Sequence, residues 1–208
     1  MVLDRVIDRG VNAKGARSRE QLLEATLRVI ATAGAEAVTY RRVADEAGLT
    51  RGAVTHHFAS REDIILQAFR HYIGTVDGQL SEISTSVRDK GIEGVIEGLV
   101  RYHVREFLDP SRVLAEYELI LFAARNEEIG RAVRAWEDAL IASLESRLEA
   151  AGAAQPRQSA HLMLAVFRAF ELESLTRRNA DPEDLRRRLR ALVHVKPGNR
   201  KQDLPEDV

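Results

Sequence analysis

The chain holds no cysteine among its 208 residues, so neither a disulfide framework nor a thiolate metal site can form. It also lacks the roughly 20 consecutive apolar residues that a membrane-spanning helix needs. The first fifteen residues carry Asp4, Arg5, Asp8 and Arg9, which interrupt the hydrophobic region that a signal peptide requires. These absences predict a soluble protein of the cytoplasm that has no membrane as a partner.

Sequence signatures of common enzymes are missing as well. The chain contains no Walker loop, no dinucleotide-binding glycine fingerprint and no GxSxG nucleophile elbow. A di-metal site in a helical bundle would require Glu-x-x-His pairs. The residues three positions before His71, His103, His161 and His194 are Ala68, Val100, Gln158 and Ala191. We therefore expect no enzyme, no cofactor and no metal site, with a transition-metal effector bound by some of the six histidines as an alternative.

The composition is that of an ordinary globular protein, with 45% apolar residues in a chain long enough for one large domain or two modest ones. Its charge is unevenly distributed. Residues 1–61 hold ten Lys and Arg against seven Asp and Glu, a net charge of +3 in a chain whose total is −1. Because a basic excess neutralises phosphates, the N-terminal part is the better candidate for a nucleic-acid contact.

Residues 39–58 have the pattern of a helix-turn-helix. Thr39 is a good N-cap for a first helix, because its side chain can accept a hydrogen bond from an otherwise unpaired backbone N–H. Gly48 suits the left-handed position just past a helix end, and Thr50 can cap a second helix. Val54 would lie on the inner face of that second helix. The segment therefore predicts two short helices joined by a tight turn.

The outward face of the second helix is small, polar or cationic, which allows such a helix to enter a major groove. Its outward residues are Arg51, Gly52, Ala53, Thr55 and His56. Ala44, Gly48 and Val54 stand where a helix-turn-helix needs, in turn, a small residue, a residue free to turn and an apolar anchor. An ordinary helical hairpin is the alternative interpretation.

A third helix is predicted ahead of the motif, from Ser18 to about Gly34, because apolar residues recur there at spacings of three and four. Two short helices alone cannot bury enough surface to fold, so this helix supports the motif. Residues 1–16 show no period and are expected to form a flexible basic arm. Ser60 is a good N-cap for a fourth helix that starts near Arg61.

In this order, the signatures resemble those of the TetR family of transcriptional regulators, named for the tetracycline repressor. The resemblance covers residues 17–65 and includes an arginine-flanked first helix ending in Ala-Gly, the run TYRRVADEAGLT, the pair His57-Phe58 and the run SRED. Thr55 departs from the pattern, because many members have tyrosine there. The resemblance implies that residues 17–62 bind double-stranded DNA at a near-palindromic operator.

The same resemblance implies roles for individual residues. The sugar-phosphate backbone would be held by Thr39, Arg41, Thr50, His56 and Arg61. Base edges would be approached by Arg51, Gly52, Ala53 and Thr55, with Arg51 favoured because its guanidinium can bond guanine through two hydrogen bonds. Arg17 would reach an adjacent minor groove. For Arg41 and Arg61, a solvated surface charge is an equal alternative.

Beyond the motif the pattern is helical throughout. Helices are expected over residues 92–108, 111–125, 127–150, 157–178 and 182–195, and residues 196–208 are expected to be a disordered tail. The prediction is an all-α fold of about nine helices. The family resemblance implies that residues 63–195 form an effector-binding and dimerisation domain.

An unknown small-molecule effector is implied for the middle helices. The candidate lining residues are Phe69, Tyr72, Tyr102, His103, Phe107, Tyr117, Glu118, Phe122, Trp136, Met163, Phe167 and Glu171. About half of them are expected to be plain core, because aromatic residues at helical spacing usually pack in the interior. Glu118 and Glu171 are the candidate inward carboxylates, with a solvent-facing position as the alternative.

A homodimer is implied through the last two helices. The candidate interface residues are Leu162, Ala165, Val166, Ala169, Phe170, Leu185, Leu189, Leu192 and Val193. The alternative is that these stripes face the chain's own core. The predicted function is a repressor released from its operator by a small apolar or amphipathic ligand. The alternative is a constitutive or architectural DNA-binding protein whose C-terminal domain only dimerises.

Overall fold

The computed structural model describes the backbone of residues 2–87, 90–177 and 180–193, and the side chains of residues 15–85, 90–177 and 180–193. These residues form nine α-helices, one 3-10 helix and no β-strand, which confirms the all-α prediction. The elements are α1 (Val2–Ala33), η1 (Ala35–Ala37), α2 (Tyr40–Ala47), α3 (Arg51–His57), α4 (Arg61–Val87), α5 (Gly91–Glu106), α6 (Pro110–Ala123), α7 (Glu127–Ala150), α8 (Pro156–Thr176) and α9 (Pro182–Arg190). None of the helices in the described ranges is long and apolar enough to cross a membrane.

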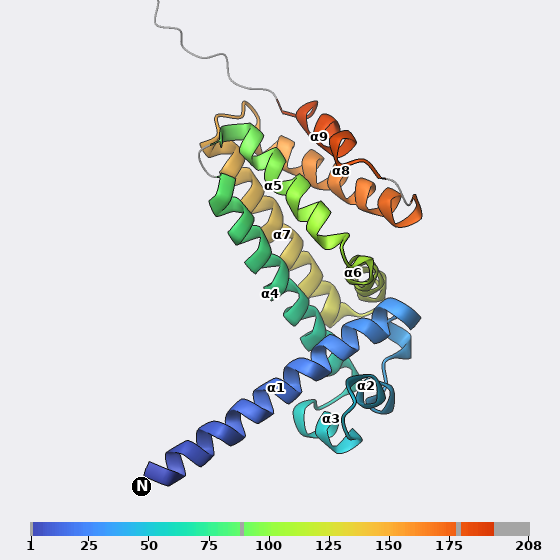
Figure 1. Cartoon of the computed structure of the whole chain (residues 1–208). Coiled ribbons are helices and arrows are strands. Elements are labelled where there is room, and N and C mark those ends of the chain that lie inside the picture. The colour runs from blue at the N-terminus through green and yellow to red at the C-terminus, as the bar shows by residue number, and fades with distance from the viewer. Residues whose placement is uncertain (1, 88–89, 178–179, 194–208) are drawn as a thin grey trace, which may run out of the picture.

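The helices form two bodies that share α4 (Figure 1). The smaller body contains α1, α2 and α3, and the larger one contains α5, α7, α8 and α9, with α4 running from the first into the second. α6 packs against α1 where the two bodies meet. A single helix therefore connects the N-terminal motif with the interior of the larger body.

The core of the smaller body is built from the apolar positions that the helical period predicts. Leu22 of α1, Val43 of α2, Val54 of α3 and Ile64 of α4 are fully buried, and Phe58 closes the cluster from the end of α3. Four elements therefore supply this core, and the two short helices of the motif are held by α1 and α4.

The start of α1 differs from the prediction. The sequence predicts a helix from Ser18, whereas α1 begins at Val2 and its N-terminal half extends away from the body (Figure 1). The prediction relied on the apolar residues that follow Ser18, so it did not place a helix start at Val2. The backbone of residues 2–16 is helical. The tail predicted over residues 196–208 lies outside the described residues.

Arg61 joins the two bodies, and its assignment to the DNA backbone is corrected. Its Nε donates to the Val38 carbonyl at 3.0 Å, and its Nη2 donates to the Ala35 carbonyl at 3.0 Å and to Glu36 Oε2 at 2.9 Å. The guanidinium also lies over the ring of Phe122 in α6. The sequence shows an arginine at a helix start but not the carbonyl groups of η1 that occupy it.

Two further contacts hold α1 against the larger body. His71 Nε2 of α4 lies 2.6 Å from Glu24 Oε1 of α1. Arg112 of α6 lies 3.9 Å from the carboxylates of both Glu24 and Glu106. The position of the motif thus depends on side chains of α4 and α6 as well as on its own core.

We expect Arg61→Ala to lower the free energy of unfolding by about 2 kcal/mol, because it removes charged hydrogen bonds to two backbone carbonyls. Urea unfolding of wild type, Arg61→Ala and Arg70→Ala measures this. Arg70 is exposed on the same helix, so its variant is the matched control. An Arg61→Ala protein of unchanged stability would contradict the assigned role.

Candidate nucleic-acid interface and effector cavity

The turn between α2 and α3 has the geometry that its residues predict. Thr39 Oγ1 accepts a hydrogen bond from Arg42 N at 3.1 Å, and Thr50 Oγ1 accepts one from Ala53 N at 3.3 Å, so both threonines are N-caps. Gly48 has a φ of 65°, the left-handed conformation that glycine adopts without steric cost. The two helices are therefore fixed by local interactions.

The outward face of α3 is open to solvent. Arg51, Gly52, Thr55 and His56 are exposed, and Ala53 is half-buried. The Thr55 hydroxyl donates to the Gly52 carbonyl at 3.1 Å. α3 lies at the end of the molecule opposite to α9 (Figure 1), so no part of the larger body covers this face. The structure thus brings together the residues predicted to approach base edges.

The residues predicted to hold the DNA backbone flank this face, with the exception of Arg61. Thr39, Arg41 and Thr50 are exposed, as is Arg17, which was predicted to reach a minor groove. Arg41 lies 3.7 Å from Asp45 with 88% of its side chain exposed, which is a weak surface pair. The capping threonines accept hydrogen bonds from backbone N–H groups, so their hydroxyl hydrogens remain able to bond a phosphate.

His57 is distinct from His56. It is half-buried beside Phe58, with ring centroids 6.3 Å apart. Burial, with the nearby charges of His56 and Arg19, lowers the pKa of His57 below its usual range. A packed, neutral His57 agrees with its omission from the candidate contacts.

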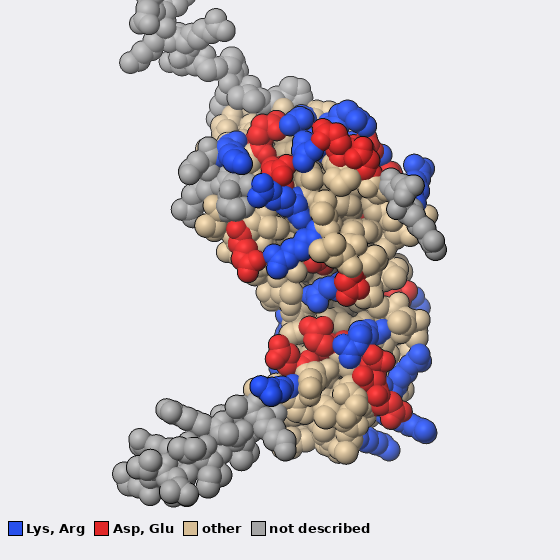
Figure 2. Space-filling view, in the orientation of Figure 1, with Lys and Arg blue, Asp and Glu red and all other residues tan. Residues whose placement is uncertain are grey.

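Charges of both signs are interspersed on the surface shown in Figure 2. Basic and acidic side chains alternate on both bodies there, and no broad surface of one sign is seen.

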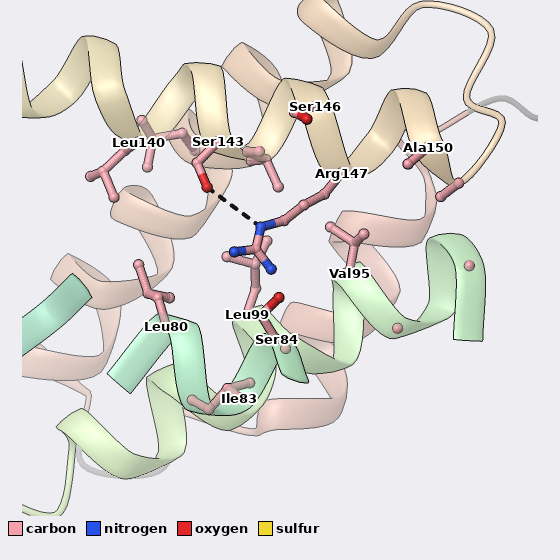
Figure 3. A pocket seen from close by; sticks show the side chains of 16 residues that line it. Leu80, Ile83, Ser84, Val95, Leu99, Leu140, Ser143, Ser146, Arg147 and Ala150 are labelled. Atoms are coloured by element: carbon pink, nitrogen blue, oxygen red, sulfur yellow. Dashed lines mark hydrogen bonds between the residues drawn. The ribbon is translucent and has the colours of Figure 1, made fainter. Parts of the chain in front are cut away.

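The larger body contains a cavity of about 800 Å³ between α4, α5, α7 and α8. Its walls are mainly aliphatic, with Leu80, Val95, Leu99 and Leu140 among them, and Arg147 reaches in from α7 (Figure 3). A smaller cavity of about 50 Å³ lies next to it, and the two share Leu80, Leu99, Leu140 and Leu164 in their walls. The larger volume lies within the usual range for a ligand pocket.

Buried polar side chains surround the smaller cavity. The Tyr72 hydroxyl donates to Glu116, and the Tyr117 hydroxyl lies 3.1 Å from Glu171 Oε2. Arg168 Nη1 donates to Glu137 Oε1 at 2.7 Å. Two further N–H groups, Trp136 Nε1 and Arg168 Nη2, have no partner in the described part of the chain.

Burial governs the protonation of the two inner carboxyl groups. It raises the pKa of Glu171 well above the usual range, and the nearby charge of Glu116 raises it further. Burial also raises the pKa of Glu116. Two carboxylates that share one interior cannot both ionise cheaply, so this cluster favours a bound proton.

The twelve candidate effector residues divide into three groups. Those that line the smaller cavity are Tyr102, Trp136, Phe167 and Glu171. Those buried in the surrounding core are Phe69, Tyr72, His103, Phe122 and Met163, and Tyr117 and Phe107 are half-buried beside it. The twelfth, Glu118, lies elsewhere. None of the twelve lines the larger cavity, so the aromatic residues predict its neighbourhood but not its walls.

Glu118 is corrected by the structure. Its carboxylate lies beside Gly34, near η1, and the inward carboxylate of α6 is Glu116. The stripe used for the prediction combines two faces of α6, because Leu114 and Leu121 are exposed, with 42% and 59% of their surface accessible, whereas Phe122 is buried. Glu118 itself is half-buried.

Sequence reasoning missed the residues that form the larger cavity. They are small or aliphatic, and the glycines Gly91, Gly94 and Gly98 of α5 are among them. Because glycine, serine and leucine are common on any helix, their identities carry no signal of a cavity. Arg147 was the detectable exception, since it interrupts the apolar side of α7.

The predicted dimer residues are only partly on the surface. Leu162, Ala165 and Ala169 are exposed on α8, together with Leu172, which was not predicted. The others are half-buried or buried within the protomer, namely Val166, Leu192, Val193, Phe170, Leu185 and Leu189. For Phe170, Leu185 and Leu189 the alternative, packing in the chain's own core, is correct.

The packing of α9 explains why these predicted dimer residues are buried within the chain. Its apolar side packs against α5 and α8 of the same chain, and its arginines pair with glutamates of those helices. Arg186 lies 2.8 Å from Glu97, Arg190 lies 2.7 Å from Glu93, and Arg188 lies 3.0 Å from Glu173. An amphipathic stripe shows that a helix is covered on one side but not which chain covers it.

The chain has an exposed recognition helix on a small helical body and a ligand-sized cavity in a larger body, and the two bodies share one helix. These features define a two-part helix-turn-helix protein. Residues 22–68 match the family model described as bacterial regulatory proteins of the tetR family, and residues 90–195 match the one described as tetracyclin repressor-like, C-terminal domain. The second match alone covers half of the chain. The chain belongs to the TetR family of transcriptional regulators.

Individual relatives resemble either the N-terminal part or the whole fold. Over 68 residues, which make up 33% of each chain, the chain is 32% identical to the transcriptional repressor KstR2 of Mycolicibacterium smegmatis. The chain spans about a third to two fifths of the length of the curated relatives it matches. The structure of a transcriptional regulator from Rhodococcus sp. Rha1 superimposes with a TM-score of 0.74 at 22% identity, covering 86% of this chain and 99% of that one.

A further structural neighbour contains a ligand. The multidrug binding protein EbrR, solved in complex with ethidium, superimposes with a TM-score of 0.67 at 26% identity, covering 86% of this chain and 99% of that one.

We expect the stability of wild type to fall as the pH rises above about 4.5, the ordinary pKa of the carboxyl group, toward the raised pKa of folded Glu171. In this window the folded protein retains a proton that the unfolded chain has released, so folding is progressively penalised. Glu171→Gln removes the contribution of Glu171, about 1.4 kcal/mol per unit of raised pKa, and leaves that of Glu116, whose pKa burial also raises. Chemical unfolding from about pH 5 to about pH 8 measures it.

Glu118→Gln is the control for this experiment, because Glu118 is only half-buried and its carboxylate lies beside Gly34, outside the lining of the smaller cavity. If both variants changed the pH dependence equally, burial of Glu171 would not be its cause.

Proposed function

We propose that a homodimer of this chain represses transcription by binding a near-palindromic operator and is released by a small apolar or amphipathic molecule. The observation that carries the proposal is the course of α4. Its first residue, Arg61, contacts η1 beside the motif, whereas Leu80, Ile83 and Ser84 near its end line the larger cavity. A molecule that moves the end of α4 would also move its beginning.

In this proposal α3 reads the operator in the major groove. Arg51, the exposed cation at the first position of α3, bonds a guanine, and Gly52, Ala53 and Thr55 approach neighbouring bases. Thr39, Arg41, Thr50 and His56 hold the phosphates, and Arg17 of α1 reaches a minor groove. The small side chains at positions 52 and 53 allow a close approach to the bases.

The homodimer uses the exposed side of α8. Leu162, Ala165, Ala169 and Leu172 follow one another at spacings of three and four, so they lie on one face of the helix. A two-fold dimer through this face would present two recognition helices about one turn of DNA apart, roughly 34–36 Å. This spacing is what a near-palindromic operator requires.

We expect Arg51→Ala to weaken operator binding by about 1–3 kcal/mol and to relax the preference for the base at one position of each half-site. The measurement is a gel-shift titration at fixed salt with the operator and with operators altered at single positions. Arg157→Ala is the matched control, because Arg157 is an exposed arginine at the start of α8, far from α3. Equal affinity and equal base preference in wild type and Arg51→Ala would show that Arg51 does not read DNA.

Ligand release is supported by the cavity and by a neighbour. EbrR shares this fold and binds ethidium, so an arrangement of this kind can hold a small molecule. A cavity of about 800 Å³ also disfavours the alternative of a constitutive DNA-binding protein whose larger body only dimerises, since such a body needs no internal space.

The proposal requires that the effector weakens the binding of the operator and that the operator weakens the binding of the effector by the same factor. The operator is first recovered by selection from genomic fragments, and compounds are then screened for those that raise the melting temperature of the protein. For each such compound, calorimetry with and without operator should show an affinity reduced by the factor by which the compound weakens operator binding. Compounds that bind equally well with and without operator would count against ligand release.

A further inference from the structure

The larger cavity has mainly apolar walls but contains one charged side chain. The described residues that line it include nine leucine, isoleucine, valine or alanine residues and no Asp or Glu, and Arg147 is the one charged residue among them. Its guanidinium points into the space between α7 and α4 (Figure 3). The cavity is therefore apolar with a single positive charge.

Arg147 differs from the other arginines of the larger body that point inward. Arg168 is 2.7 Å from Glu137, Arg186 is 2.8 Å from Glu97, and Arg188 is 3.0 Å from Glu173. Arg147 makes one side-chain hydrogen bond within the described ranges, from Nε to Ser143 Oγ at 3.4 Å. Arg147 thus has a neutral neighbour where the others have a carboxylate.

The start of α5 adds a second positive feature. Gly91, its first residue, and Gly94 line the cavity, and the N-cap Lys90 makes no side-chain cap hydrogen bond. The N-terminus of a helix carries a partial positive charge from its aligned peptide dipoles. The one acidic residue of this first turn, Glu93, pairs with Arg190 of α9 and is thereby neutralised.

We propose that the larger cavity binds an amphipathic anion, whose negative group pairs with Arg147 near the start of α5 and whose apolar part lies on the leucines shared with the smaller cavity. Those leucines are Leu80, Leu99, Leu140 and Leu164. The guanidinium offers two parallel donors, which match a carboxylate or phosphate. Gly94 and Gly98 leave two positions of the α5 wall without a side chain, which makes room for the apolar part.

The inner carboxyl groups do not reverse this preference. Glu116 is bonded to Tyr72, and Glu171 lies within hydrogen-bond distance of Tyr117, both outside the lining of the larger cavity. The larger cavity is thus left with a positive charge, which disfavours an organic cation there. This inference rests on the proposed function, because it names the chemical class of the effector.

Three probes of equal chain length test the sign of the charge, namely decanoate, 1-decanol and decyltrimethylammonium, all below micelle formation. The chain has a single tryptophan, Trp136, in the wall of the adjoining cavity, so its fluorescence reports binding. We expect wild type to bind decanoate about tenfold more tightly than the alcohol and to bind the cation most weakly. Decyl phosphate in a fourth arm shows which anion is preferred, and binding of either anion supports the inference.

The variants locate the site. Arg147→Gln should lose about tenfold in affinity for decanoate, and Arg147→Lys should restore part of it. Arg131→Gln, an exposed arginine on the same helix, should bind as wild type does. Gly98→Leu should abolish binding of every probe by filling the cavity. Circular dichroism confirms that each variant is folded.

Three results would overturn the inference: a cation bound as tightly as decanoate, unchanged decanoate affinity in Arg147→Gln or Gly98→Leu, or no binding of any probe to wild type. The proposed function fails separately. If decanoate binds through Arg147 but leaves operator affinity unchanged, ligand release by this class is wrong and the site stands. If a neutral compound releases the operator without dependence on Arg147, ligand release stands and the anionic site is wrong.

Discussion

The continuity of α4 is the constraint on which the rest of the structure depends. One unbroken helix begins at Arg61, beside the turn that carries α3, and ends at Val87, past the residues that line the cavity. Its start is fixed by reciprocal hydrogen bonds, since Ser60 Oγ accepts from Asp63 N at 3.0 Å and Asp63 Oδ2 accepts from Ala59 N at 2.9 Å. A packed helix moves as a unit, because close-packed interiors deform little within an element. The recognition helix and the cavity are therefore attached to the same rigid body.

The larger body separates two kinds of polar environment. Around the smaller cavity, Glu116 and Glu171 are covered, hydrogen-bonded to tyrosines and biased toward holding a proton. In the larger cavity, the side-chain hydrogen bond that Arg147 makes within the described residues goes to the hydroxyl of Ser143. Buried carboxyl groups that are hydrogen-bonded favour one arrangement of the helices, whereas an arginine without a carboxylate partner can pair with an anionic ligand. The two cavities share leucines in their walls, so a ligand in one cavity contacts side chains that also line the other.

Local signals made the helix-turn-helix predictable from the sequence. Thr39, Gly48 and Thr50 act through hydrogen bonds or backbone angles within a few residues, so their roles follow from sequence spacing alone. The start of α1 was missed because the prediction relied on the apolar residues that follow Ser18. Glu118 was chosen over Glu116 because leucines lie on both faces of α6, and only tertiary packing decides which face is covered. Leu185 and Leu189 were placed correctly on one side of a helix, but the sequence could not say that α5 and α8 of the same chain would cover them.

Because ion pairs hold α9 in place, ionic strength acts on the larger body as well as on the DNA-binding surface. Arg186, Arg188 and Arg190 hold α9 to the helices that bound the cavity through pairs that are partly open to solvent. Dissolved ions screen such pairs over about 8–10 Å at physiological concentrations. The same ions compete with the phosphate contacts of any DNA-binding surface through counterion release. A change in salt would therefore loosen the operator and relax the frame of the cavity together, so the influence of an effector on DNA binding is comparable between experiments only at one ionic strength.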